Sequence, residues 1–105
     1  MTIKPLPNFQ GFDWDEGNSG KNLETHGITD SECEAVFFNS PLLVVNDAKH
    51  SDLEIRFATF GLTNENRFVM LVFTMRANFI RVISARDMNR REKAWYKNYE
   101  KDAEI

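Results

Sequence analysis

The chain has 105 residues, 42% of them hydrophobic and nine of them phenylalanine, which is enough for one hydrophobic core and too little for two. No apolar run reaches the roughly 18 residues of a membrane helix and the polar N-terminus has no signal-peptide pattern, so we expect a soluble, cytoplasmic protein. A single cysteine, Cys33, excludes an internal disulfide and a thiolate zinc cluster, and the net charge of −3 argues against a general nucleic-acid coat protein.

The first half of the chain predicts a lead-in, one strand and two helices. Residues 1–8 lack periodicity and should be a flexible lead-in to a single domain over residues 9–105, which starts with an edge strand over residues 9–14. Asp15 as N-cap and Gly27 as C′ residue bracket a helix of about three turns. Thr29 and Glu32 form a capping box that starts the next helix. That helix places Cys33 in its apolar phase, as a small core residue.

The second half changes to a period of two residues, which is typical of strands. Four strands are predicted, over Leu42–Val45, Glu54–Leu62, Phe68–Thr74 and Phe79–Ala85. A last helix starts with Asn89 as N-cap and Glu92 three residues later. The expected architecture is α+β, in the order β-α-α-β-β-β-β-α, with a mainly antiparallel sheet packed by helices.

The arginines are confined to the second half, while most acidic residues lie in the first. They are Arg56, Arg67, Arg76, Arg81, Arg86, Arg90 and Arg91. Because the planar guanidinium makes forked contacts, arginines on strands indicate a phosphate or carboxylate ligand. Ion pairs with the acidic first half are the alternative, and for any single arginine we favour it.

The tight connection near Ala77 and Asn78 decides which arginines act together. A two-residue loop puts Arg76 and Arg81 on one face of the sheet, whereas a three-residue loop puts them on opposite faces. The sequence leaves both open.

No strong enzyme motif is present, but two histidines are candidates for proton transfer. His26 precedes Gly27 at a helix C-terminus, where capping is the simpler role, and His50 lies in a polar loop, where solvation is the simpler one. Metal-free RNA cleavage through the 2′-hydroxyl needs a base, an acid and cations on the phosphorane, and these residue types supply all three.

Several segments resemble the BrnT family, the ribonuclease toxins of type II BrnT/BrnA toxin–antitoxin systems, over about residues 9 to 99. In the first half they are Phe12-Asp13-Trp14-Asp15, Asn22-Leu23, His26-Gly27-Ile28, Phe37-Phe38 and Asp47 with His50. In the second half they are Arg56-Phe57, Gly61, Val72-Phe73-Thr74-x-Arg76, Ile80-Arg81-Val82-Ile83-Ser84-Ala85-Arg86 and Arg90-Arg91-Glu92 through Tyr96.

The resemblance implies a RelE-like fold, an endoribonuclease that cleaves RNA to arrest growth, and no metal or cofactor. It also implies a BrnA-like ribbon-helix-helix antitoxin, through which alone the complex would bind operator DNA. The catalytic set carried over is His26, Arg56, Arg76, Arg81 and Arg86, with His50 and Tyr96 as further acid/base candidates. Lys21, Arg90 and Arg91 are the expected RNA-binding residues.

Two positions depart from the family pattern, which usually has lysine where this chain has Asn18 and Thr25. Lys21, close by on the same predicted helix, is a candidate substitute for the first. The departures support an alternative, a catalytically weak or inactive relative that acts as an antitoxin-binding co-repressor. A free-standing RNA-binding module is a third, less favoured hypothesis, because the composition is acidic. The aromatic residues Trp95, Tyr96 and Tyr99 would contact the antitoxin or, more simply, pack the last helix onto the sheet.

Overall fold

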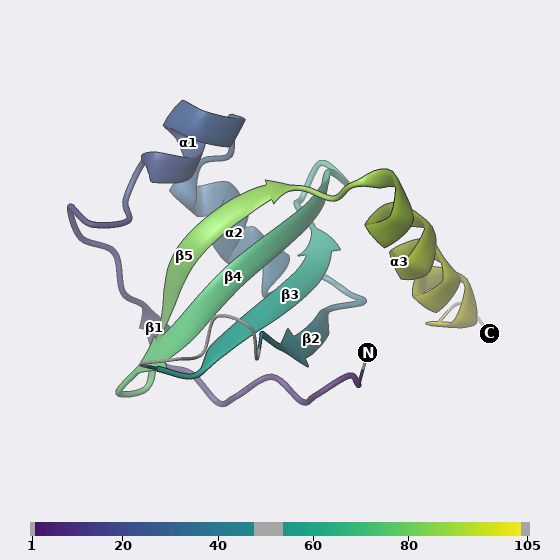
Figure 1. Cartoon of the computed structure of the whole chain (residues 1–105), viewed down its shortest axis with the longest axis horizontal. Helices are drawn as coiled ribbons and strands as arrows, with labels where there is room; N and C mark the ends of the chain where they lie inside the picture. The colour runs from purple at the N-terminus through teal and green to yellow at the C-terminus, as the bar shows by residue number, and fades with distance from the viewer. Residues whose placement is uncertain (1, 48–53, 104–105) are drawn as a thin grey trace.

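The computed structural model describes residues 2–47 and 54–103, and these form five strands and three helices (Figure 1). In chain order the elements are β1 (Gly11–Phe12), α1 (Lys21–His26), α2 (Asp30–Val36), β2 (Leu43–Asn46), β3 (Arg56–Leu62), β4 (Phe68–Arg76), β5 (Phe79–Asp87) and α3 (Arg90–Ala103). The α+β class and the element order are as expected. None of the helices in the described ranges combines the length and apolar character that crossing a bilayer requires.

The strands form one mixed sheet in the order β1-β5-β4-β3-β2. The three pairings among β2, β3, β4 and β5 are antiparallel, whereas β1 pairs with β5 in parallel. The expected edge strand over residues 9–14 is therefore present but short, since only Gly11 and Phe12 join the ladder.

The helix expected from Asp15 starts later, so this prediction was wrong at its N-terminus. Asp15 is no N-cap: residues 16–20 are turns, and α1 begins after Gly20, whose φ is 75°. The end was predicted correctly, because Gly27 has a φ of 68° and its N–H bonds to the last turn of α1. Glycines within the predicted helix are the physical reason for its shortening.

Both predicted capping boxes are confirmed. At α2, the Thr29 hydroxyl accepts a hydrogen bond from the Glu32 N–H, and the Glu32 carboxylate accepts one from the Thr29 N–H, each at 3.0 Å. At α3, the Asn89 and Glu92 side chains accept from each other's N–H groups at 2.8 and 2.9 Å. The sequence thus located both of these helix starts to the residue.

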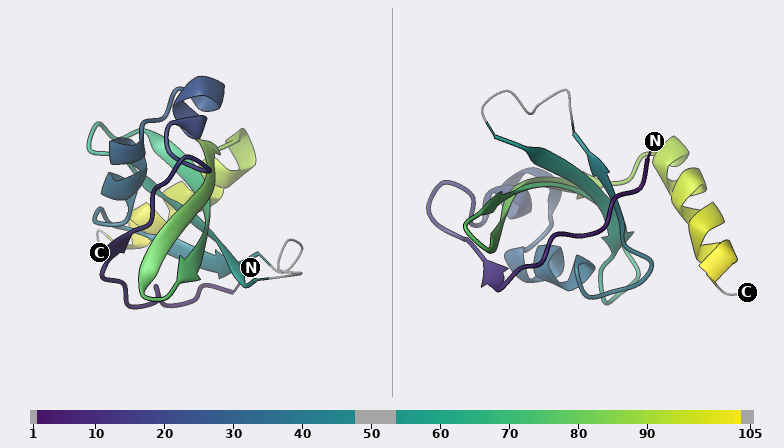
Figure 2. Two further views of the ribbon diagram at one scale, coloured as in Figure 1. Left: turned by 90° about the vertical axis from the view of Figure 1, so that its left-hand side faces the viewer. Right: turned by 90° about the horizontal axis from the view of Figure 1, so that it is seen from below.

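Two apolar clusters lie on opposite faces of the sheet. The first includes Leu71 and Phe73 of β4 and is covered by α2 through Val36 and Phe37. The second lies under α3, whose Trp95 and Tyr96 make edge-to-face contacts with Phe60 and Phe68, respectively. Figure 2 shows α1 and α2 at one side of the sheet and α3 at the other. The simpler interpretation of Trp95 and Tyr96, packing α3 onto the sheet, is confirmed, whereas Tyr99 is exposed.

The lead-in expected over residues 1–8 contacts the domain from residue 3 onward. The Lys4 N–H donates to the Val44 carbonyl at 2.7 Å, which places this segment beside β2. Ile3 packs against the second cluster and Leu6 against the first.

Candidate functional site

Arginines from three neighbouring strands share one face of the sheet. The strand pairing sets Thr74 of β4 directly between Arg56 of β3 and Arg81 of β5, and Arg76 follows two residues along β4. Because neighbouring strands are about 4.8 Å apart, the Cα atoms of Arg56 and Arg81 lie about 10 Å from each other. We call this surface, with Arg86, the arginine face. It is the side that α3 covers further along, where Arg86 contacts Glu92 of α3.

The loop of the β4–β5 hairpin answers the question that the sequence left open. Arg76 pairs with Phe79, so the loop has two residues, Ala77 and Asn78, and Arg76 and Arg81 lie on the same face. Ala77 supplies the positive φ of this turn, 53°, a conformation that favours glycine or asparagine.

A bulge in β5 adds Arg86 to this face. Residues five apart on a regular strand point to opposite faces, so Arg81 and Arg86 would diverge. The pairing shifts, however, between Val72, which faces Ser84, and Phe73, which faces Val82, leaving Ile83 as an extra residue. The extra residue inverts the alternation, and Arg86 therefore points to the same side as Arg81.

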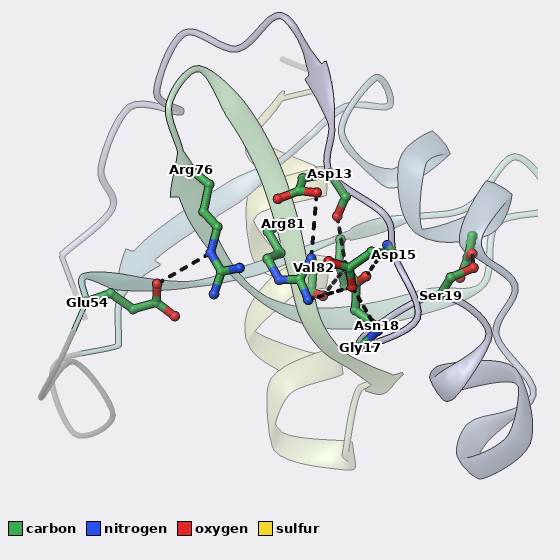
Figure 3. A network of polar contacts seen from close by, with 10 residues as sticks. Asp13, Asp15, Gly17, Asn18, Ser19, Glu54, Arg76, Arg81 and Val82 are labelled. Atoms are coloured by element: carbon green, nitrogen blue, oxygen red, sulfur yellow. Dashed lines mark hydrogen bonds and ion pairs between the residues drawn. The ribbon is translucent and has the colours of Figure 1, made fainter.

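Acidic residues from the segment after β1 hold Arg81 (Figure 3). Its Nη2 donates to Asp15 Oδ1 at 2.9 Å, and its Nη1 lies 3.6 Å from Asp13 Oδ1. The side chain of Arg81 is only 12% exposed, whereas that of Asp15 is 57% exposed. The hydrogen bond from Arg81, with one from the Gly17 N–H, holds the pKa of the Asp15 carboxyl below its usual value.

The segment that carries these carboxylates is fastened to β5 by Asn18. The Asn18 amide donates to the carbonyls of Asp13 and Val82 at 2.9 and 3.0 Å, and its oxygen accepts from the Asp15 N–H at 2.8 Å. Asn18 is only 4% exposed. Its side chain therefore serves the loop's own structure and is not presented to a ligand.

Among the arginines of the face that form ion pairs, Arg76 has the most exposed side chain. Its side chain is 52% exposed, and its Nε lies 3.9 Å from Glu54 Oε2, a distance too long for a hydrogen bond. Arg56, on the neighbouring strand, is half-buried. In Figure 3 the guanidinium groups of Arg76 and Arg81 point to the same region in front of the sheet.

Arg86 is tied to the start of α3. Its two terminal nitrogens bond to the two Glu92 oxygens at 2.7 and 3.0 Å, and Nη1 also donates to the Asp87 carbonyl at 3.0 Å. Burial raises the pKa of the Glu92 carboxyl, but hydrogen bonds from Arg86 and from the Asn89 N–H outweigh it and leave the pKa below its usual value. The predicted ion pair with the acidic first half is confirmed for Arg81, whereas for Arg86 the prediction was wrong about the partner. In Arg86 the carboxylate comes from α3 and not from the acidic first half.

The candidate acid/base residues do not join the arginine face. His26 ends α1, and its carbonyl accepts from Arg67, which pairs with Asp87 at the end of β5. Asp87 is six residues from Arg81 along β5, on the order of 15–20 Å, so His26 lies far from the Arg76–Arg81 pair. His50 lies outside the described residues.

Tyr96 is a core residue. It has no exposed surface, its hydroxyl donates to the Pro41 carbonyl, and burial raises its pKa well above the usual value. Cys33 is likewise buried, and burial raises the pKa of its thiol to about 12, as suits the expected small core residue. Neither side chain can exchange protons with a ligand at the sheet surface.

The remaining predicted RNA-binding residues are exposed but dispersed. Lys21 begins α1 on the other side of the sheet, whereas Arg90 and Arg91 begin α3. Among residues 2–47 and 54–103, the side chains of both arginines form no ion pair or hydrogen bond. Of Lys21, Arg90 and Arg91, only the two arginines come shortly after the last arginine of the face, Arg86, in the sequence.

The sequence favoured ion pairs between single arginines and the acidic first half, but it did not indicate which carboxylates would form them. Asp13, Asp15 and Glu54 all contact arginines of the face. One signal for Asp13 and Asp15 was available in the sequence. They alternate with Trp14 directly after an edge strand, and a segment in this place continues beside the strand that pairs with the edge strand.

The fold and the site define a class: small α+β proteins whose sheet presents clustered arginines on one face. A family model described as the ribonuclease toxin BrnT of type II toxin–antitoxin systems matches residues 14–92 of the 105. The chain belongs to this BrnT family, and the resemblance is thereby confirmed. A toxin–antitoxin family implies an antitoxin partner and an RNA target. No curated protein matches the chain.

Proposed function

We propose that this chain is a metal-independent endoribonuclease toxin that cleaves RNA in the cytoplasm to arrest growth and that a BrnA-like ribbon-helix-helix antitoxin neutralises it. The observation that carries the proposal is the arginine face, within a chain whose family is defined by ribonuclease toxins. The assignment of a RelE-like fold belongs to the same proposal.

The arginines would act on the scissile phosphate. The 2′-hydroxyl oxygen loses its proton to water and attacks the adjacent phosphorus, and the phosphorane that forms carries additional negative charge on its non-bridging oxygens. Its collapse breaks the bond to the 5′-oxygen, which takes up a proton from water and leaves with the downstream strand, so that a 2′,3′-cyclic phosphate remains. Arg76 and Arg81, diagonal neighbours on adjacent strands, would hold these oxygens through forked hydrogen bonds. Arg56 would approach from the opposite side of Thr74. Fixed cations at such a position stabilise the transition state more than the ground state.

The proposed catalytic set is smaller than the sequence suggested. Burial removes Tyr96 from it, and the position of His26 at the far end of β5 removes that residue as well. Arg86 is kept as a residue that positions α3 and adds positive charge, because both of its terminal nitrogens already bind Glu92.

The test is cleavage of RNA by the purified protein in EDTA, together with growth on induction without an antitoxin. Wild type should cleave and arrest growth, and Arg76→Gln and Arg81→Gln should each lower cleavage by about 10²-fold or more, because each removes a phosphate contact. Lys101→Gln, which removes one exposed charge at the end of α3, is the matched control. Absence of cleavage and of growth arrest with the folded wild type would overturn the proposal.

A second candidate function is a catalytically weak co-repressor that binds the antitoxin. It is favoured by one observation: the side chain at position 18, usually lysine in the family, is a buried asparagine bonded to main-chain atoms. Tight antitoxin binding and operator repression by a protein that does not cleave RNA would establish it.

A further inference from the structure

Resting on the proposed function, we propose that Asp15 is a built-in competitor for the RNA phosphate. Its carboxylate takes the place at Arg81 that a phosphate oxygen would take, and RNA displaces it to bind. Asp15 therefore sets how tightly the arginine face holds RNA.

The contact has the geometry of the ligand that it would replace. The separation of 2.9 Å between Arg81 Nη2 and Asp15 Oδ1 equals that of a charged guanidinium–phosphate hydrogen bond. Asp15 and the phosphate would compete for the Arg81 guanidinium, whose hydrogen-bonding capacity is only partly satisfied. Arg81 Nη1 is buried and has an ion-pair contact with Asp13 at 3.6 Å, but no hydrogen bond in the described part of the chain. An incoming phosphate could bond to both nitrogens of the guanidinium.

The carboxylate can leave without unfolding the loop. The loop backbone is fastened by Asn18, whose three hydrogen bonds do not involve the Asp15 side chain. That side chain is 57% exposed, and within the described residues its other hydrogen bond comes from the Gly17 N–H at 2.8 Å. A change in the Asp15 side-chain torsions is therefore enough to release Arg81.

The approach to Arg81 beside Asp15 is kept clear by Gly17. A Cβ atom at this position would lie 2.9 Å from Arg81 Nη2 and 3.0 Å from Asp15 Oδ1. The missing side chain leaves room at the guanidinium for the carboxylate, and for the phosphate that replaces it.

The test is the affinity for a single-stranded RNA oligonucleotide with 2′-O-methyl groups, which cannot be cleaved by 2′-hydroxyl attack. Asp15→Asn keeps the shape of the side chain and removes its charge, and it should bind about 3- to 10-fold more tightly than wild type at low salt. Glu16→Gln is the matched control, since it removes the same charge one residue away from an exposed side chain. It should change the affinity less than about twofold. Thermal unfolding shows that each variant is folded.

The outcomes separate this inference from the proposed function. Tighter binding by Asp15→Asn than by Glu16→Gln supports the competitor. Equal binding by the two variants overturns the inference, although the wild type would still bind RNA. Weaker binding by Asp15→Asn also overturns it, because Asp15 would then position Arg81 for RNA binding. If neither wild type nor Asp15→Asn binds RNA, the proposed function fails along with the inference.

Discussion

One amide, that of Asn18, joins two segments 64 residues apart, because its side chain bonds to the Val82 carbonyl of β5. The same side chain closes the loop on itself through Asp13 and Asp15. Removing it takes away the partner that Asn18 provides to the Asp13 carbonyl and the Asp15 N–H of this loop, and to the Val82 carbonyl of β5, whose bond is buried. The residue is thus a structural part of the site, although it is not placed to touch a ligand.

Asn18→Ala should lower the free energy of unfolding by about 2–3 kcal/mol, because several hydrogen bonds are lost and polar groups remain unsatisfied. Asn98→Ala, the same change on the exposed side of α3, should alter stability by less than about 0.5 kcal/mol. Urea denaturation followed by circular dichroism measures both. Equal stability of the two variants would show that the Asn18 bonds contribute little.

Single residues were the hardest scale to predict from the sequence. Asn18 stood out only as the absence of a lysine, since the acceptor on Val82 becomes visible only when β5 lies beside the loop. Tyr96 posed the opposite problem: a phenol suits proton transfer, packing or partner binding equally well. Its complete burial, which depends on α3 folding back onto the sheet, decides for packing.

At the scale of elements, α3 depends on a carboxylate that does three things. Glu92 completes the capping box with Asn89, lies near the positive end of the helix dipole and binds Arg86. Its pKa is lowered in the folded protein, so the unfolded chain takes up this proton at a higher pH. The contribution of Glu92 to stability is therefore present above a pH of about 4.3 and is lost as the pH falls through the lower, folded pKa.

Glu92→Gln should accordingly lower the free energy of unfolding by about 1–2 kcal/mol at pH 7, and this deficit should shrink as the pH falls from about 5 to 3. Glu65→Gln, in the exposed turn before β4, is the control whose curve should run parallel to that of wild type. Urea denaturation across this pH range gives the curves. A deficit for Glu92→Gln that stays constant with pH would contradict the assigned role.

Elements were predicted best where their signals are local. Capping boxes involve residues three apart, and the strand alternation needs only the chain itself, so α2, α3 and the central strands were found. The parallel pairing of β1 with β5 joins segments about 70 residues apart and has no local signal. The start of α1 was misjudged because Gly17 and Gly20 interrupt the helix expected from Asp15, and α1 begins only after Gly20, which takes a left-handed conformation.

Across the whole molecule, a net charge of −3 coexists with a cluster of arginines on one sheet face. The overall charge should disfavour broad RNA contact, so binding should depend on a few phosphates at this cluster. For single-stranded RNA each neutralised phosphate contributes about 0.7 to the slope of log affinity against log salt. If Arg56, Arg76 and Arg81 each contact one phosphate, the slope is about −2.1.

Arg76→Gln should therefore make this slope shallower by about 0.7, because it removes one phosphate contact. Lys101→Gln should leave the slope unchanged. Titration of the 2′-O-methyl RNA at several salt concentrations measures all three proteins. A slope near zero for wild type would mean that Arg81 and Arg76 remain paired with Asp15 and Glu54 in the presence of RNA. The composition is enough to predict the sign of the net charge. The position of the arginine face could be assigned only once the register of the β4–β5 hairpin was known.

The bulge at Ile83 has a consequence for how this segment can change over evolutionary time. Because the extra residue sets which way Arg86 and the following Met88 point, the length of β5 between Arg81 and Arg86 matters more than the identity of the residue at 83. Substitution of Ile83 preserves the alternation, but loss of a single codon between Val82 and Ser84 would turn Arg86 and the connection to α3 toward the opposite side of the sheet. In this stretch, substitutions should therefore be tolerated, whereas single-residue deletions should not.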